Sequence, residues 1–481
     1  MPEEKLFIYN TLTRQKEEFK PLIPGKIKMF VCGSTVYDDA HLGHAKTYID
    51  FDIAVRWLRR IGYEVHYVQN ITDVDDKIIQ RAKEKGIGAI ELARYYEKRL
   101  FEDMERLGVK QDVTEYPRSH DYIEAIKNQI QLLADKGYAY YLDGDVYYDV
   151  DKFKDYTALS GMKLEELTNH RIEPKEGKRR PYDFALWKAA PQGEEPSWDI
   201  SVRFEGKDLK LHGRPGWHIE DTAMTYSIFG PQYDIHGGAS ELIFPHHTNE
   251  IAQAEAAFGV KPFVRYWMHS GVLNVDGKKM SKSLHNFITI REFLEKHDAE
   301  VLRLLVLSSH YSKELNYTSQ LVENTENKLR YLYQAIGAFY SMPEGSSDGK
   351  EIEELGKTFS SFELDFSAAM NSDFNTSLAL LSLAKAAGEL KRFADSCKSI
   401  THSKKEELFE RIMSMASVFG ILNKEKLSSP LSKEMQDLIK KREELRAQKL
   451  YEESDRIREE LKAKGVRLED TEYGTVWYTD A

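Results

Sequence analysis

Two short motifs, far apart in the chain, carry side chains that could bind the phosphates of a nucleotide. His41-Leu42-Gly43-His44 offers two imidazoles, and Lys279-Met280-Ser281-Lys282-Ser283 offers two ammonium groups and two hydroxyls. Imidazole N–H groups donate to phosphate oxygens, and a lysine-bearing loop stabilises negative charge that is redistributed in a transition state. Taken separately, neither motif identifies a site, because a surface turn with two histidines and a solvated Lys/Ser loop explain them as well.

The first motif lies in a segment with the pattern of a strand, a helix and a second strand. Residues 27–33 resemble a strand that stops at Gly33, residues 49–58 have helical spacing, and residues 65–68 resemble another strand. This order predicts a parallel sheet with a right-handed crossover. Ligands of such sheets collect at the carboxyl ends of the strands, where the HLGH motif falls. Thr72 or Asp73 is the expected cap of the next helix.

Length and composition set the scale of the whole chain. The 481 residues, 41% hydrophobic and 31% charged, suit about three domains. Lys and Arg total 68 against 79 Asp and Glu, and the resulting net charge of −11 argues mildly against a nucleic-acid partner when taken alone. The two cysteines form no disulfide framework, and no signal segment or membrane-spanning apolar run is present. We therefore expect a cytoplasmic protein without membrane attachment.

The fold class expected from these patterns is α/β, with a Rossmann-type parallel sheet divided by an insertion and followed by helices. Residues 1–115 are the first half of the sheet domain, and residues 116–214, mostly helical and then irregular, are the insertion. Residues 215–308 are the second half, which includes the KMSKS loop. Helical spacing dominates residues 309–428, and residues 429–481 combine charged amphipathic helices with a short hairpin.

Considered together, the two motifs point to a known group of enzymes. An HxGH element after the first strand and a downstream KMSKS form the signature pair of class I aminoacyl-tRNA synthetases. The chain resembles the cysteinyl-tRNA synthetase family in particular, from near Leu6 to Trp477. The segments that carry this resemblance are FVCGSTVYDDAHLGHAKTYIDFD, NITDVDDKII, RPGWHIED, DIHGGASELIFPHHTNEIAQ and KKMSKSLHNF.

The resemblance implies a two-step reaction. The carboxylate of L-cysteine attacks the α-phosphorus of ATP and releases pyrophosphate, and the cysteinyl group then moves to the 3′-terminal adenosine of tRNA(Cys). It implies that His41 and His44 contact the α-phosphate, and that Lys279 and Lys282 stabilise the β- and γ-phosphates and the departing pyrophosphate. Magnesium is expected only as the counterion of ATP, since no dedicated carboxylate cage is visible.

The resemblance also assigns residues to the nucleoside and to the amino acid. His236, Gly237, Gly238 and Glu241 are implied to surround the adenine and the ribose, although the two glycines suit a plain turn equally. Trp217 is implied to wall the side-chain pocket, and Thr72 to lie near the substrate. An ordinary core tryptophan and a helix cap are the alternatives for these two residues.

A zinc ion at the floor of the amino-acid pocket, one per chain, is a further implication. In the family its ligands are two cysteines, a histidine and a glutamate, which Cys32, His246 and Glu250 match at three positions. Asp221 stands where the second cysteine is expected. An aspartate oxygen can bind zinc, but the set becomes harder and less thiophilic. Alternatively, Asp221 only pairs with nearby charges, and the metal is held by three ligands or lost.

The helical part resembles the family's stem-contacting bundle, and residues 429–481 resemble its anticodon-binding domain. Four residues there match positions that could contact anticodon bases, although each is equally an ordinary surface residue. They are Arg446, Tyr451, Asp455 and Asp470. One basic cluster is either a tRNA backbone contact or a soluble loop: Arg171, Lys175, Lys178, Arg179 and Arg180. The expected partners are tRNA(Cys), ATP and L-cysteine, and the expected state is a monomer.

Two other functions fit part of these patterns. An ATP-dependent ligase that joins cysteine to a small amine would keep the HLGH, zinc and KMSKS elements, but LEDTEYGTVW near the carboxyl terminus argues against it. A catalytically inactive RNA-binding relative is the second alternative, and intact His41, His44 and Lys282 argue against that. The segment DISVRFEGKDLKLHG is longer than the family's common form, and nothing in the sequence assigns it a role.

Overall fold

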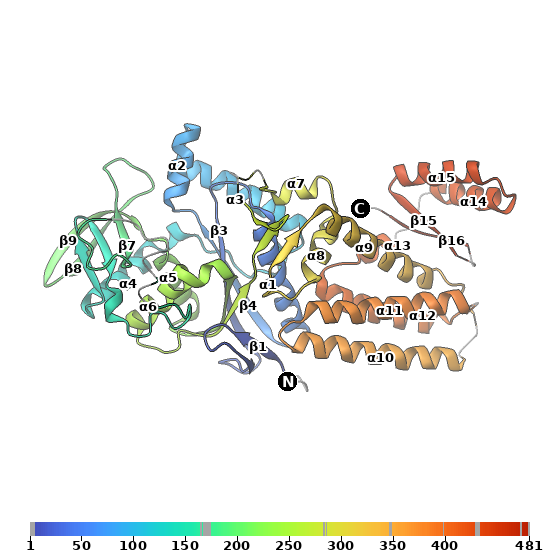
Figure 1. Cartoon of the computed structure of the whole chain (residues 1–481), viewed down its shortest axis with the longest axis horizontal. Helices are drawn as coiled ribbons and strands as arrows, with labels where there is room; N and C mark the ends of the chain where they lie inside the picture. The colour runs from blue at the N-terminus through green and yellow to red at the C-terminus, as the bar shows by residue number, and fades with distance from the viewer. Residues whose placement is uncertain are drawn as a thin grey trace. The chain divides into compact units, whose positions relative to one another are not determined.

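A computed structural model of the chain shows two units, drawn in Figure 1. The first comprises Met1–Glu295 with Tyr311–Asn316, and the second Lys296–His310 with Tyr317–Ala481. The structure describes residues 5–163, 166, 175–281, 284, 286–345, 349–397, 399–428, 433–471 and 474–479. Among these residues, no helix combines the length and the apolar character that crossing a bilayer requires.

A parallel sheet in the order β11-β10-β3-β4 organises the first unit. Its strands come from two distant parts of the chain, as expected for a divided sheet. Residues 29–32 of β3 are buried in succession, because a central parallel strand is covered on both faces. The bounds are β3 (Lys26–Thr35), β4 (Glu64–Thr72), β10 (Tyr233–Ala239) and β11 (Val264–Ser270), with crossover helices α1 (Leu42–Arg60) and α6 (Thr248–Phe258).

The insertion carries its own antiparallel sheet, in the order β5-β6-β7-β9-β8, so the expectation of irregular structure there is wrong. Two hairpins of this sheet close through pairs of residues at positive φ, Asp143-Gly144 and Glu205-Gly206. The DG pair is the signal that could have indicated the first hairpin. The elements are α4 (Ile123–Asp135), β5 (Ala139–Leu142), β6 (Asp145–Tyr148), β7 (Phe184–Ala189), β8 (Trp198–Phe204) and β9 (Lys207–Pro215).

The helix after β4 begins later than expected. Thr72 is the last residue of β4, and Asp75 caps α2 by accepting a hydrogen bond from the backbone N–H of Lys77 at 2.7 Å. The remaining helices of this unit are α2 (Asp76–Lys85), α3 (Ala89–Arg106), η1 (Lys110–Asp112), η2 (Ser119–Tyr122), η3 (Val150–Lys152), α5 (Ile219–Phe229), η5 (Ser240–Leu242), η6 (Ile243–His247) and α7 (Ile290–Leu294). The remaining strands are β1 (Phe7–Asn10), β2 (Gln15–Glu18), β12 (Leu273–Val275), β13 (Lys278–Lys279) and β14 (Leu315–Tyr317).

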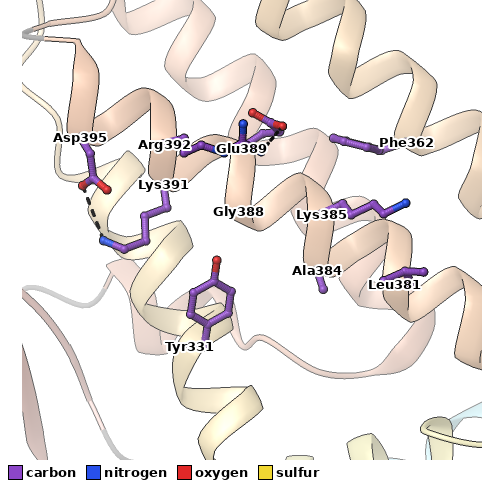
Figure 2. A pocket seen from close by; sticks show the side chains of 10 residues that line it. All are labelled: Tyr331, Phe362, Leu381, Ala384, Lys385, Gly388, Glu389, Lys391, Arg392 and Asp395. Atoms are coloured by element: carbon purple, nitrogen blue, oxygen red, sulfur yellow. Dashed lines mark hydrogen bonds and ion pairs between the residues drawn. The ribbon is translucent and has the colours of Figure 1, made fainter.

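Helices form most of the second unit, and a small helical pair with a hairpin ends it. A hollow of about 770 Å³ is lined by side chains of α9, α10 and α11, among them Tyr331, Lys385 and Arg392 (Figure 2). The elements are α8 (Ala299–Leu307), α9 (Ser319–Tyr340), α10 (Lys350–Asn371), α11 (Thr376–Ser396), α12 (His402–Phe419), α13 (Lys424–Ser428), α14 (Lys433–Ala447), α15 (Tyr451–Ala463), β15 (Val466–Thr471) and β16 (Gly474–Thr479).

Candidate active site

The strands of the parallel sheet place chemically active side chains near their carboxyl ends. Cys32 lies in β3, His236 in β10 and His269 in β11, while α5 and α6 contribute Asp221 and Glu250. All five side chains are buried. Segments separated by up to about 240 residues therefore meet at one edge of the sheet, where ligands of such sheets bind.

Cys32, Asp221, His246 and Glu250, the four ligands expected from the resemblance, form one buried cluster. The Sγ atom of Cys32 lies 3.5 Å from Oδ2 of Asp221. Nε2 of His246 lies 2.9 Å from the same Oδ2 and 3.1 Å from Oε1 of Glu250. One ligand atom from each of the four residues lies within 4.8 Å of the others. His246 is in η6 rather than in the following helix, yet it still faces Glu250 four residues later.

A second, overlapping cluster shares Cys32 and Glu250 and adds His236 and His247. Nε2 of His236 is 3.4 Å from the Cys32 sulfur, and Nε2 of His247 is 3.1 Å from it. His247 in turn contacts His269, whose Nε2 lies 2.8 Å from Nδ1 of His247. His247 and His269 are not among the site residues predicted from the sequence. The double histidine in the PHH run is the signal that could have indicated His247.

The donor set fits a zinc ion. A thiolate, imidazoles and carboxylates are zinc ligands, and neighbouring ligand atoms around a tetrahedral zinc lie roughly 3.3–3.8 Å apart, close to the spacing of this cluster. Among the described residues, no hydrogen bond of suitable geometry reaches either carboxylate oxygen of Glu250, although Nε2 of His246 lies 3.1 Å from Oε1. Burial raises the pKa of the Cys32 thiol, and burial together with the charges of Asp221 and Glu220 raises the pKa of Glu250. A bound cation would favour the ionised forms of these buried groups, which burial alone disfavours.

Trp217 and Thr72 both lie beside this cluster. The Trp217 ring stacks on His246, with ring centroids 4.4 Å apart. Thr72 donates from Oγ1 to Glu220 at 3.2 Å, next to Asp221 in the chain. Trp217 also lines a cavity of about 410 Å³ together with His218, Phe184 and Asn249. Trp217 thus contacts a candidate metal ligand with its ring and also lines a cavity.

The two histidines of the HLGH motif form the amino-terminal cap of α1. Nδ1 of His41 accepts a hydrogen bond from the backbone N–H of Gly43 at 3.0 Å, and Nδ1 of His44 accepts one from the backbone N–H of His41 at 3.2 Å. The two rings stack with centroids 3.9 Å apart. Because each Nδ1 is an acceptor, the proton of each neutral imidazole is on Nε2, which makes Nε2 a hydrogen-bond donor.

Both imidazoles are neutral at physiological pH. Burial lowers the pKa of His41 to about 4. Burial, with contributions from His41 and Lys77, lowers the pKa of His44 well below its ordinary value. Together with the amino terminus of α1, these groups form an electropositive cap made of N–H donors that carries no full charge.

Lys279 of the KMSKS motif lies in β13, and its ammonium group forms an ion pair with the carboxylate of Glu241. Both side chains are exposed. Two residues expected at the nucleotide, one for the phosphates and one for the ribose, therefore contact each other. Lys282 lies outside the described residues, so its predicted role rests on the sequence alone.

His236, Gly237 and Gly238 lie within β10 and are buried. His236 faces the cluster at Cys32, as described above. A Cβ atom on Gly237 would lie 2.4 Å from the ring of Phe51, so a close approach between β10 and α1 requires glycine there. This packing reason was not apparent from the sequence, where a plain turn was the alternative.

Comparison with known proteins identifies the family. A family model described as "tRNA synthetases class I (C) catalytic domain" matches residues 18–327, and another, "DALR domain", matches residues 365–423. Two curated relatives named "Cysteine--tRNA ligase" come from Thermococcus onnurineus (strain NA1) and Thermococcus gammatolerans. They are 44% identical over 480 residues and 45% identical over 479 residues, with 98% of this chain and 98% of each relative covered. The chain belongs to the cysteine–tRNA ligase family.

Solved structures agree with a class I synthetase fold. The methionyl-tRNA synthetase of Mycobacterium tuberculosis in complex with methionyl-adenylate aligns with a TM-score of 0.58 at 15% identity, covering 82% of this chain and 89% of that chain. A ternary complex of Agrobacterium radiobacter K84 LeuRS aligns with a TM-score of 0.57 at 11% identity, covering 84% and 86%. At these identities the similarity concerns the fold. A cysteine–tRNA ligase family member is an enzyme, a ligase of the class I synthetase group.

In this cysteine–tRNA ligase family member, the expected anticodon residues lie in the small carboxyl-terminal part of the second unit. Arg446 of α14 forms an ion pair with Asp470 of β15 at 3.0 Å. Tyr451 and Asp455 are exposed in α15. The VRLEDTEYGTVWY segment forms the antiparallel pair β15–β16, which confirms the expected hairpin.

The basic cluster of the insertion is largely neutralised by acidic residues. Arg179 pairs with Asp149 at 2.8 Å, Arg180 pairs with Asp151 at 2.5 Å, and Lys175 pairs with Asp145. Lys178 donates to the backbone oxygen of Pro181 at 2.9 Å, and Arg171 lies outside the described residues. These pairs favour the soluble-loop interpretation, since each of the four cations that the structure describes already has a structural partner.

Proposed function

We propose that this enzyme activates L-cysteine with ATP and transfers it to tRNA(Cys). The main support is the 44–45% identity to proteins named "Cysteine--tRNA ligase" over nearly the full length of the chain. The buried cluster around Cys32 supports the same conclusion, because its donor set suits a metal that can bind a substrate thiol.

In the first step, a carboxylate oxygen of cysteine attacks the α-phosphorus of ATP, the bond to the bridging oxygen breaks, and pyrophosphate leaves. His41 and His44 donate from Nε2 to oxygens of the α-phosphate. Lys279 and Lys282 stabilise the charge on the β- and γ-phosphates, with magnesium as the counterion of ATP. His236, Gly237, Gly238 and Glu241 bind the nucleoside part. Catalysis then comes from positioning and electrostatic stabilisation, without a covalent enzyme intermediate.

In the second step, a ribose hydroxyl of the tRNA 3′-terminal adenosine attacks the carbonyl carbon of the cysteinyl-adenylate. AMP leaves, and the cysteinyl group forms an ester with the tRNA. The hydroxyl group loses its proton, which is released to the solvent, so that the step yields the ester, AMP and one proton. The same His41 and His44 donors then stabilise the phosphate of the leaving AMP.

For selection of cysteine, we propose one zinc ion per chain, held by Cys32, Asp221, His246 and Glu250. When bound, zinc supplies a Lewis acid that binds a thiolate more strongly than the hydroxyl of serine. Trp217 holds the imidazole of His246 in place by stacking and limits the size of the substrate side chain. Thr72, through Glu220, fixes the start of α5 beside Asp221.

For tRNA, we propose that the helical unit contacts the stem and that the last 50 or so residues bind the anticodon. The hollow in Figure 2 offers Lys385, Lys391 and Arg392 from one face of α11, with Tyr331 of α9 beside them. Arg446, Tyr451, Asp455 and Asp470 are the proposed anticodon contacts. We further propose that the enzyme acts as a monomer in the cytoplasm.

Two assays on the purified full-length chain test this function. The first measures exchange of labelled pyrophosphate into ATP in the presence of single amino acids, and the second measures charging of tRNA(Cys). We expect exchange with cysteine but not with serine, and charging of tRNA(Cys). Exchange with cysteine without charging would instead favour a ligase that joins cysteine to a small amine. Charging of a different amino acid would overturn the proposal.

A further inference from the structure

Asn70 connects the candidate metal site to the parallel sheet. It is buried in β4, two residues before the end of that strand. Its Oδ1 accepts a hydrogen bond from the backbone N–H of Gly33 at 2.6 Å, and its Nδ2 donates to Oδ1 of Asp221 at 2.7 Å. One side-chain amide therefore joins β3, β4 and the first turn of α5.

The orientation of this amide follows from its partners. A backbone N–H can only donate, so the amide oxygen must face Gly33, and the NH₂ group must face Asp221. The register of β3 with β4 shifts between Val31 and Ser34, which leaves the N–H of Gly33 for the side chain of Asn70. A Cβ atom on Gly33 would lie 1.5 Å from the backbone oxygen of Asn70, so only glycine permits this approach.

The contact to Asn70 determines which oxygen of Asp221 faces the cluster. Oδ1 is engaged by the amide, and Oδ2 lies 3.5 Å from Sγ of Cys32 and 2.9 Å from Nε2 of His246. A carboxylate can rotate or bind through both oxygens, whereas a cysteine at this position would present a single donor atom. Ligand carboxylates are commonly oriented by hydrogen bonds of this kind, and losing such a bond reduces metal affinity by roughly 10–100-fold.

We propose that Asn70 is a positioning residue that holds Asp221 as a one-oxygen metal ligand. This inference rests on the metal site of the proposed function. If this is correct, replacing Asn70 lowers the metal affinity when residue 221 is an aspartate. The same replacement changes the metal affinity much less when residue 221 is a cysteine.

A double-mutant cycle on the full-length protein tests this dependence. Asn70→Asp keeps the size of the side chain and an oxygen for Gly33 but removes the donor to Asp221. Asn70→Ser adds no charge and shortens the side chain, which withdraws the donor from Asp221. Each is made alone and together with Asp221→Cys. Zinc affinity is measured by competition with a chromophoric chelator, and cobalt(II) absorption spectra report the ligand set. Gln69→Met, a buried neighbour in β4, is the control.

We expect both Asn70 variants to lower zinc affinity about 10–100-fold with Asp221 present. With Asp221→Cys, the same changes should alter affinity less than about threefold. Asp221→Cys should also strengthen the sulfur-to-cobalt absorption band, and Gln69→Met should leave affinity unchanged. Wild-type affinity in both Asn70 variants, or equal losses in both backgrounds, would overturn this inference alone. A wild-type protein that binds no zinc would overturn the metal site and the inference with it.

Discussion

At the scale of single residues, the cap of α1 shows how a neutral group can serve a negatively charged substrate. Backbone N–H groups occupy Nδ1 of His41 and of His44, so both rings present Nε2–H. Burial keeps both imidazoles uncharged at neutral pH. Donors that are already oriented need no reorganisation when charge develops on a phosphate.

Replacing His44 tests this arrangement. His44→Ala removes one donor to the α-phosphate and should lower kcat for pyrophosphate exchange by roughly 10²–10³-fold, with a smaller effect on the KM for cysteine. His44→Gln, whose amide N–H can occupy the position of Nε2–H, should recover part of this loss. His212→Gln, in the β8–β9 hairpin, is the control. An equally inactive Gln variant would contradict the donor role of Nε2.

The lowered pKa of His41 predicts a dependence of stability on pH. The unfolded imidazole takes up a proton near 6.5, but the folded one remains neutral until about pH 4. Its contribution is therefore fully present above pH 6.5 and decreases as the pH falls from 6.5 toward 4. Denaturant midpoints at pH 7, 6 and 5 should decrease less in His41→Asn than in the wild type. His402→Gln, at an exposed position, should keep the wild-type trend. Parallel trends in His41→Asn and wild type would refute this prediction.

At the scale of elements, a buried arginine is one of the groups that attach the carboxyl-terminal hairpin to its helices. Arg442 of α14 is fully buried, and its guanidinium donates to both oxygens of Asp470 at 2.5 and 2.7 Å. These hydrogen bonds hold the pKa of Asp470 below its usual range. The same Asp470 carboxylate pairs with Arg446, so the buried arginine positions two of the proposed anticodon contacts.

Arg442→Met should therefore separate the two activities. It leaves Asp470 without its main partner and destabilises the packing of β15–β16 on α14 by about 1–3 kcal/mol. We expect this variant to charge tRNA with a KM for tRNA that is about tenfold higher or more. Its rate of pyrophosphate exchange should equal that of the wild type. Faster hydrogen exchange of the β15–β16 amides would accompany the change. Lys440→Met, exposed on the same helix, is the control. Equal loss of both activities would count against a role confined to tRNA.

At the scale of the whole molecule, a net charge of −11 coexists with a proposed RNA substrate. Net charge describes the average surface, whereas binding to phosphates depends on local groups of cations. In the hollow of Figure 2, Lys391 pairs with Asp395 at 3.5 Å and Arg392 pairs with Glu389, so acidic residues moderate the positive charge. Such a surface favours RNA contacts that are weak individually and sensitive to salt.

Salt should therefore affect charging much more than amino-acid activation. Between about 50 and 200 mM salt, we expect the KM for tRNA to rise steeply, because each phosphate contact contributes roughly 0.7–0.9 to the slope of log KM against log salt. Pyrophosphate exchange should change little. Lys385→Gln combined with Arg392→Gln should reduce the slope by about one to two. Lys357→Gln, exposed on α10 outside the hollow, should leave it unchanged. An unaltered slope in the double variant would place the RNA contacts elsewhere.

The sequence by itself determined which side chains are available and where the main elements lie. Periodicity and spacing identified the βαβ unit, the helical part, the terminal hairpin and the place of the HLGH motif between β3 and α1. These features depend on residues that are close together in the chain, so local sequence patterns are enough to predict them. Two strand pairs of the insertion, β5–β6 and β8–β9, are local hairpins whose Tyr, Val and Trp residues and turns were overlooked. The pairing through β7 that joins them into one sheet links residues as far apart as Val146 and Trp187, which no local pattern indicates.

Only the tertiary structure decided how the candidate metal site is built. Cys32 and Asp221 are 189 residues apart in the chain, yet their ligand atoms lie 3.5 Å apart. No sequence signal indicated the contribution of Asn70, since a buried amide has many ordinary roles, and the double histidine was the only sign of His247. The chemistry of these side chains depends on which groups face them. The sheet decides this by placing β10, β3 and β4 side by side, and α5 and α6 add Asp221 and Glu250 to the same cluster.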